Sequence, residues 1–168
     1  GMALTVVLFV LLLSEIRRAP PEPGREWIAA IPVLMLASTR SVAVWGTSGL
    51  ETRLFEVLVV AGVLRSTHEV ACVEAGGRPK PWAMPLLGLA ALTRPEGVLF
   101  GVSVFGAAAL WLGRTRLWPR VRALTPGLAL FVVIVGAHLA FRRAYYHDWV
   151  PNTYYAKVGG HSWWSMGT

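Results

Sequence analysis

The stretch that decides the fold is WAMPLLGLAALTRPEGVLFGVSVFGAAALWL, residues 82–112. It is almost entirely apolar outside residues 93–97, where an arginine and a glutamate stand on either side of a proline. Charged side chains inside such an apolar run are costly in a membrane unless they form ion pairs or are hydrated. The proline disfavours helical backbone at Arg94 and can open a new helix. The sequence therefore predicts two helices, 82–92 and 98–112, joined by a charged turn.

Four further apolar blocks lie outside this stretch. These blocks are residues 2–13, 27–37, 54–64 and 127–141. The chain of 168 residues is 55% hydrophobic and only 15% charged, against roughly 25% charged residues in soluble domains. Several blocks are shorter than the about 20 residues of a full membrane crossing, so we expect broken or re-entrant segments among them. We predict an all-α fold, a polytopic transmembrane helical bundle of about six spans, some short or broken.

The 16 lysines and arginines outnumber nine acidic residues and give a net charge of +7. Here the basic residues lie between apolar blocks, which is where a bilayer places them, so we expect a membrane partner and no nucleic acid. With six spans, alternate loops fall on two sides. The loops 15–26, 65–80 and 113–122 hold ten basic residues, against five on the other side. The excess of positive charge predicts that these three loops are cytoplasmic.

This assignment leaves three polar segments together on the outer side. They are residues 45–53, 93–97 and 145–157. In the first, Glu51 stands at the start of a predicted helix, where a carboxylate complements the helix dipole or faces a polar cavity and binds substrate or an arginine. In the second, Arg94 and Glu96 form either a paired turn or a site at which the planar guanidinium meets a phosphate.

The third polar segment mixes aromatic rings with polar side chains. Aromatic residues form a belt at a membrane boundary, but rings next to Asn152 could also stack on a sugar and bond its hydroxyls. His147 beside Asp148 lacks a third ligand at a recognisable spacing, so we expect no metal site there. Cys72 is the single cysteine, which excludes an intrachain disulfide and a Cys-rich metal site, and we expect it to be an unreactive thiol in a loop.

Three motifs in these segments carry a resemblance to a known family. They are SGLET at residues 48–52, LTRPEG at 92–97, and a tyrosine pair at 145–146 followed by VPNTYYAK at 150–157. In order and spacing they resemble the bacterial polytopic GT-C glycosyltransferases, specifically the group that includes the cell-wall terminal arabinofuranosyltransferases. The resemblance covers residues 38–157. It implies a multi-pass protein of the bacterial inner (cytoplasmic) membrane with its active face outward.

The resemblance also implies a reaction and roles for its residues. A sugar passes from a polyprenyl-phosphate donor to a cell-envelope glycan, lipid or protein acceptor, and a divalent metal is optional. Arg94 would offset the charge of the departing phosphate, with Lys157 and Arg143 as further cations. Glu51 would orient Arg94 or hold a sugar hydroxyl. The other expected substrate-binding residues are Glu96, Asn152, Tyr154 and Tyr155.

The ends of the chain predict a piece of a longer protein. The apolar residues 2–13 have no basic segment before them and no cleavage site after them, both of which a signal peptide would have. We therefore expect the chain to begin inside a membrane span. We expect residues 1–157 to be the membrane region and 158–168 the start of an outer segment. The family's catalytic carboxylate lies in the first outer loop, so we expect it upstream of this chain, and we expect the fragment alone to be inactive.

Two other functional classes stay open on the sequence alone. A transporter or lipid flippase also has broken helices and intramembrane charges, although no internal repeat is evident. A non-catalytic membrane assembly subunit would use its charged pairs only to hold helices together. The lipid bilayer is a partner in all three cases, whereas the lipid-linked sugar and the envelope acceptor belong to the enzyme.

Overall fold

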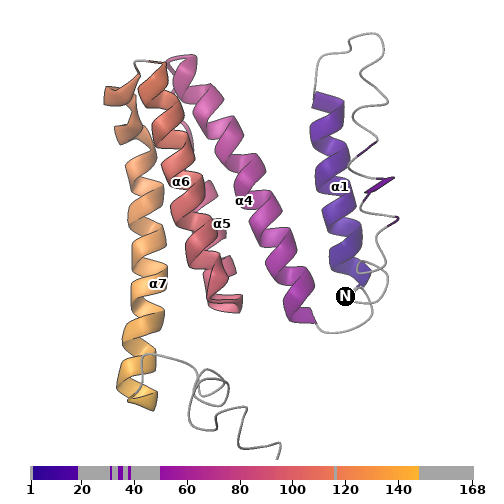
Figure 1. The fold of residues 1–168 in the computed structure, drawn as a ribbon, viewed down its shortest axis with the longest axis vertical. Helices are drawn as coiled ribbons and strands as arrows, with labels where there is room; N and C mark the ends of the chain where they lie inside the picture. The colour runs from indigo at the N-terminus through magenta and orange to yellow at the C-terminus, as the bar shows by residue number, and fades with distance from the viewer. Residues whose placement is uncertain are drawn as a thin grey trace, which may run out of the picture. The chain divides into compact units, whose positions relative to one another are not determined.

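The computed structural model describes residues 2–18, 31, 34–35, 38, 50–115 and 117–147. Within these residues the chain is all-helical and contains no strand, as Figure 1 shows. The elements are the α-helices α1 (Met2–Arg18), α4 (Leu50–Glu74), α5 (Ala83–Thr93), α6 (Glu96–Arg114) and α7 (Thr125–Tyr146), and the 3-10 helix η1 (Trp118–Leu124). The predicted all-α class is confirmed for this part of the chain.

Two described stretches are long and apolar enough to cross a membrane, Glu96–Arg114 and Trp118–Tyr146. Two more, Met2–Glu15 and Ala83–Thr93, are apolar but shorter. The predicted block at residues 27–37 lies mostly outside the described residues. The structure therefore supports a membrane protein through two helices and does not establish a count of six spans.

The charged turn separates α5 from α6 as the sequence predicts. Arg94 follows the last residue of α5 with extended backbone (φ −143°, ψ 138°), and Pro95 is the N-cap of α6. The Arg94 amide still bonds to the carbonyl oxygen of Ala90 at 3.0 Å, and the Gly97 amide bonds to the Arg94 carbonyl at 2.9 Å. The chain reverses within these residues, so α5 and α6 pack against each other.

Helix α4 is longer than its apolar block. The prediction that residues 65–80 form a loop is wrong for its first part, because the helix continues to Glu74. Charged side chains in this part are paired along the helix, with Arg65 Nε 3.2 Å from Glu69 Oε1 one turn later. Such a pair stabilises a helix by about 0.2–0.5 kcal/mol. Cys72, expected in a loop, consequently lies half-buried on α4.

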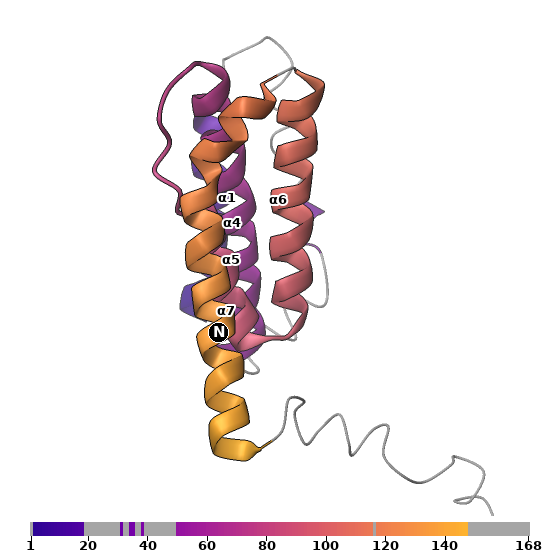
Figure 2. The same cartoon turned by 90° about the vertical axis from the view of Figure 1, so that its left-hand side faces the viewer.

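Helix α5 is a half-length helix, as expected for some of the apolar blocks. Its 11 residues rise about 16 Å, roughly half of the hydrocarbon thickness of a bilayer. Residues 77–82 before it are not helical, and Figure 2 shows this segment running from the end of α4 back along the helices to the start of α5. Arg65 Nη2 fastens the segment to α4 by donating to the Lys80 carbonyl oxygen at 2.9 Å.

Two apolar clusters hold these helices together. The first joins α4, α6 and η1 and consists of Val73, Ala108, Leu112 and Leu124. The second joins Met84 and Leu87 of α5 to Phe131 of α7. The α5 face is buried over most of its length, which fixes the position of the residue that follows it, Arg94.

The chain divides into two compact units, residues 1–135 and 136–168. In the second unit the described residues are the last part of α7 and His147. The Tyr145 ring stacks on Phe141 at a centroid distance of 5.6 Å and meets Tyr146 edge-on at 4.8 Å. Arg143 donates to the backbone oxygen of His147. The predicted boundary after residue 157 lies outside the described residues.

Candidate functional site

The structure describes three of the predicted substrate-binding residues, Glu51, Arg94 and Glu96. Glu51 lies in the first turn of α4, as predicted, and Glu96 lies in the first turn of α6. The other four lie outside the described residues. These are Asn152, Tyr154, Tyr155 and Lys157.

Arg94 is the centre of the candidate site. Its Nε lies 3.6 Å from Glu51 Oε1, and its Nη2 donates to Thr52 Oγ1 at 3.0 Å. The guanidinium carbon is 5.8 Å from the centroid of the Phe55 ring, a distance at which a cation and an aromatic face attract each other. Phe55 in turn meets Phe100 of α6 edge-on at 5.9 Å. Three side chains of α4 thus contact the arginine that follows α5, and Phe100 of α6 supports one of them.

Two helix N-termini accompany this arginine. α4 and α6 run in the same direction (Figure 1), and both begin at the end of the molecule where α5 stops. The first amides of a helix carry partial positive charge and favour an anion nearby. The guanidinium of Arg94 adds a positive charge at this place, next to the carboxylates of Glu51 and Glu96 in the first turns of α4 and α6.

The ion pair that Arg94 makes can be exchanged. The Arg94 side chain is 39% exposed and the Glu51 side chain 66%. An ion pair so open to solvent contributes only about 0–1 kcal/mol. A phosphate oxygen could therefore take the place of Glu51 at small cost, and the planar guanidinium has donors on two edges for it.

Glu96 is exposed and stands two residues after Arg94. Among the described residues the ion pair of Arg94 is with Glu51 on another helix, and not with Glu96 within the turn. The interpretation of residues 93–97 as a turn closed by its own charged pair is therefore wrong. Glu96 complements the N-terminus of α6 and faces solvent at the same end as Arg94.

Sequence reasoning missed a buried carboxylate at the start of α5. The Glu69 side chain is 4% exposed and accepts the Ala83 backbone amide at 2.9 Å, while Arg65 Nε lies 3.2 Å from the same oxygen. The first amides of a helix have no partner within it, and here a side chain from α4 supplies one. The spacing of four residues between Arg65 and Glu69 predicts their ion pair on a helix, but nothing in the sequence predicts the bond from the Ala83 amide.

A buried arginine was also left out of the predicted site. Arg53 is 1% exposed and its Nη1 lies 2.5 Å from Glu56 Oε2, one turn later on α4. The neighbouring Thr52 bonds Arg94. The first turns of α4 therefore carry an ion pair with a buried arginine, two residues after Glu51 and its exposed ion pair with Arg94.

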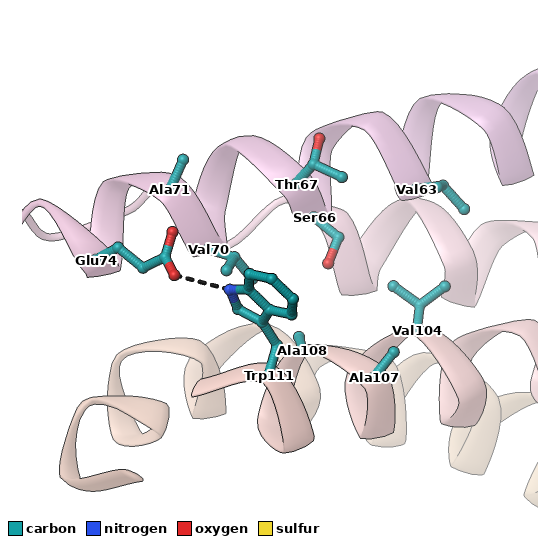
Figure 3. A pocket seen from close by; sticks show the side chains of 10 residues that line it. All are labelled: Val63, Ser66, Thr67, Val70, Ala71, Glu74, Val104, Ala107, Ala108 and Trp111. Carbon is teal, nitrogen blue, oxygen red and sulfur yellow. Dashed lines mark hydrogen bonds between the residues drawn. The ribbon is translucent and has the colours of Figure 1, made fainter. Parts of the chain in front are cut away.

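A groove of about 440 Å³ lies between α4 and α6, toward their C-terminal ends. Figure 3 shows its lining, which is formed by Val63, Ser66, Thr67, Val70, Ala71, Glu74, Val104, Ala107, Ala108 and Trp111. Most of this surface is apolar. At one end the Trp111 indole Nε1 donates to Glu74 Oε1 at 2.7 Å. The sequence could not indicate this groove, because the helical part of α4 that lines it was predicted as a loop.

Within the described part of the chain, no group of three or more His, Cys, Asp and Glu side chains could hold a metal ion. The chain matches no protein-family model, no curated protein and no solved structure.

Proposed function

We propose that this protein is a polytopic membrane glycosyltransferase of the GT-C type, similar to the terminal arabinofuranosyltransferases. It transfers a sugar from a polyprenyl-phosphate donor to a cell-envelope acceptor on the outer side of the bacterial cytoplasmic membrane. The observation that carries the proposal is the convergence of Arg94 with the N-termini of α4 and α6, where we propose that the donor phosphate binds.

Exposed apolar surface supports the membrane part of the proposal. Only 28% of the most apolar stretch of α6 is buried within the protein, and only 17% of the most apolar stretch of Trp118–Tyr146. Leu110 and Val133, for example, are 69% and 64% exposed. Contiguous apolar surface of this kind marks an interaction site on a soluble protein, and a bilayer covers it here. In the proposed bundle of about six spans, α5 is the short, broken span.

Arg94 is assigned to the leaving phosphate. The acceptor oxygen attacks the anomeric carbon, the bond from that carbon to the phosphate oxygen breaks, and the electron pair leaves with the phosphate. A donor group placed where this charge develops stabilises the transition state. The acceptor proton passes to a carboxylate base, and we assign no described carboxylate to that role, because Glu51 faces Arg94 and is proposed to orient it or to hold a sugar hydroxyl.

Further side chains are proposed to complete the substrate site. Glu96 lies at the same end as Arg94 and is exposed, so it can accept from a sugar hydroxyl. Arg143 and Lys157 are further cations for the phosphate. Asn152, Tyr154 and Tyr155 are proposed to bind the sugar.

The half-length helix α5 favours a second candidate, a transporter or lipid flippase. In such proteins the N-terminus of a broken helix points at an anionic substrate group. In this chain the Ala83 amide at the N-terminus of α5 already bonds to Glu69. This helix end therefore supports a substrate site less than the surroundings of Arg94 do. An assembly subunit is favoured still less, because the exposed pair of Arg94 and Glu51 adds too little energy to hold helices together.

The test is sugar transfer by the full-length protein, purified in detergent and given radiolabelled polyprenyl-phosphate pentoses and hexoses with envelope acceptors. Replacing Arg94 with alanine should lower transfer about a hundredfold or more, the usual effect of removing one charge-stabilising donor. The matched control is Arg78→Ala, which removes an exposed arginine from the segment between α4 and α5 and should leave transfer unchanged.

Two outcomes would count against the proposal. Undiminished transfer by a folded Arg94→Ala variant would remove Arg94 from the site. Translocation of a lipid-linked sugar across proteoliposomes, without transfer from any donor, would assign the protein to the transporters.

A further inference from the structure

The groove between α4 and α6 has the shape of a site for a hydrocarbon chain. On α4 it extends from Val63 to Glu74, a rise of about 16 Å, so it is long and narrow. Its wall is open along its length, because Thr67, Ala71 and Ala107 are exposed. A volume of about 440 Å³ lies within the range of small-molecule sites in proteins.

The one charged residue of the lining, Glu74, stands at one end of this groove, and Ser66 and Thr67 are its other polar residues, with an aliphatic wall around them. Trp111 and Glu74 close that end with the bond from the indole to the carboxylate, as Figure 3 shows. Indoles of membrane proteins gather at the level of the lipid headgroups. The groove is therefore arranged like a lipid, with a mostly apolar length and a charged end.

The charge at the polar end is positive. Arg114 follows Trp111 by three residues on α6, which places it on the same helix face one turn closer to the end, and it is exposed. Arg120 of η1 reaches the last residues of α4 and donates to the carbonyl oxygens of Val73 and Glu74 at 3.1 Å. Two guanidinium groups against the single carboxylate of Glu74 favour an anionic headgroup.

We infer that this groove binds one hydrocarbon chain of an anionic phospholipid of the surrounding membrane, with the lipid phosphate beside Arg114. The site lies at the opposite end of α4 and α6 from Arg94, so it is separate from the proposed sugar site. The inference rests on the membrane placement in the proposed function and does not depend on sugar transfer.

Lipid binding by the full-length protein in detergent tests the inference. Native mass spectrometry counts the molecules of phosphatidylglycerol or phosphatidylcholine that stay bound. The first phosphatidylglycerol should bind more tightly than the first phosphatidylcholine. Ala107→Leu fills the groove from an exposed position and should weaken phosphatidylglycerol binding about tenfold, the effect of excluding about two methylene groups.

Matched variants separate the groove from general effects. Ala140→Leu changes an exposed alanine of α7 and should leave lipid binding unchanged. Ala71→Leu fills the groove from the α4 side and should repeat the effect of Ala107→Leu if that variant folds poorly. Arg114→Gln should weaken phosphatidylglycerol alone, whereas Arg122→Gln, which removes an equal charge from η1, should change it less.

Three results would overturn the inference. One is equal phosphatidylglycerol binding by the two groove-filling variants and the α7 control. Another is equal affinity for the anionic and the zwitterionic lipid. The third is a dimer that Ala107→Leu abolishes, which would assign the groove to a second copy of the chain.

Discussion

The two ends of α4 each receive an arginine from elsewhere in the chain, and they receive it differently. At the C-terminal end, Arg120 bonds two backbone oxygens, those of Val73 and Glu74, both at 3.1 Å. At the N-terminal end, Arg94 meets side chains, with Thr52 at 3.0 Å and Glu51 at 3.6 Å. Arg120 caps the C-terminus of α4, whereas Arg94 contacts side chains that another ligand could replace.

The helix dipole alone does not account for this difference. The last carbonyls of α4 have no partner within the helix and attract a cation, so Arg120 lies where a helix stabilises it. Arg94 lies at the C-terminal end of α5, which also favours a cation, and beside the N-termini of α4 and α6, which favour an anion. What separates the two arginines is their partners: Arg120 bonds backbone oxygens and caps a helix, whereas Arg94 bonds side chains that an anion can replace.

The largest expected effect comes from the glycine that makes the turn at Arg94 tight. A Cβ on Gly97 would lie 2.5 Å from Ala91 Cα and 2.6 Å from the Ala90 carbonyl carbon. These are backbone atoms of α5, so the two helices would have to separate. We expect Gly97→Ala to lower the free energy of unfolding by about 3 kcal/mol and to abolish transfer by moving Arg94. Unfolding in mixed dodecyl sulfate micelles, followed by circular dichroism, measures the change.

The control for this variant lies on the same helix. A Cβ on Gly106 would meet nothing within 4 Å, so Gly106→Ala should stabilise α6 by about 0.5–1 kcal/mol through its helix propensity. If both alanine variants were equally stable, the close contact of the turn with α5 would not exist in solution.

A smaller loss should follow at the start of α5. Glu69→Ala leaves the Ala83 amide without its acceptor and removes the ion pair of Arg65. An unsatisfied buried donor costs about 1–3 kcal/mol, so we expect a loss of about 2 kcal/mol. Hydrogen exchange at the Ala83 amide should accelerate. Arg78→Ala, at an exposed position between α4 and α5, should cost less than about 0.5 kcal/mol, and an equal loss in both variants would contradict the role of Glu69.

The break between α5 and α6 could be predicted because its cause is local. Proline after Arg94 acts on the backbone next to it, whatever the rest of the chain does. Placing Glu51 and Arg94 at one end needed only the order of the apolar blocks and the alternation of loops. These predictions depend only on adjacent residues and on the order of apolar blocks and loops along the chain.

The length of α4 and the groove could not be predicted because their causes are tertiary. Arg65 and Glu69 look like loop residues until α5 presents the Ala83 amide to them. The groove needs the late turns of α4 to be helical and to stand beside α6. Pairing within the 93–97 turn was wrong for the same reason, since the partner of Arg94 comes from another helix.

The smallest expected effect tests the two arginines directly. Arg120→Ala removes two bonds to carbonyl oxygens at the end of α4 and should lower the free energy of unfolding by about 1 kcal/mol. Because this arginine is a cap, sugar transfer should stay within about twofold of the unchanged protein, whereas Arg94→Ala should lower transfer about a hundredfold or more. Arg122→Ala, at an exposed position of the same 3-10 helix, should change stability by less than about 0.5 kcal/mol. Loss of transfer in both the Arg94 and the Arg120 variants would mean that the two ends of α4 do not differ in function, since a cap would then matter to the chemistry as much as the proposed phosphate ligand.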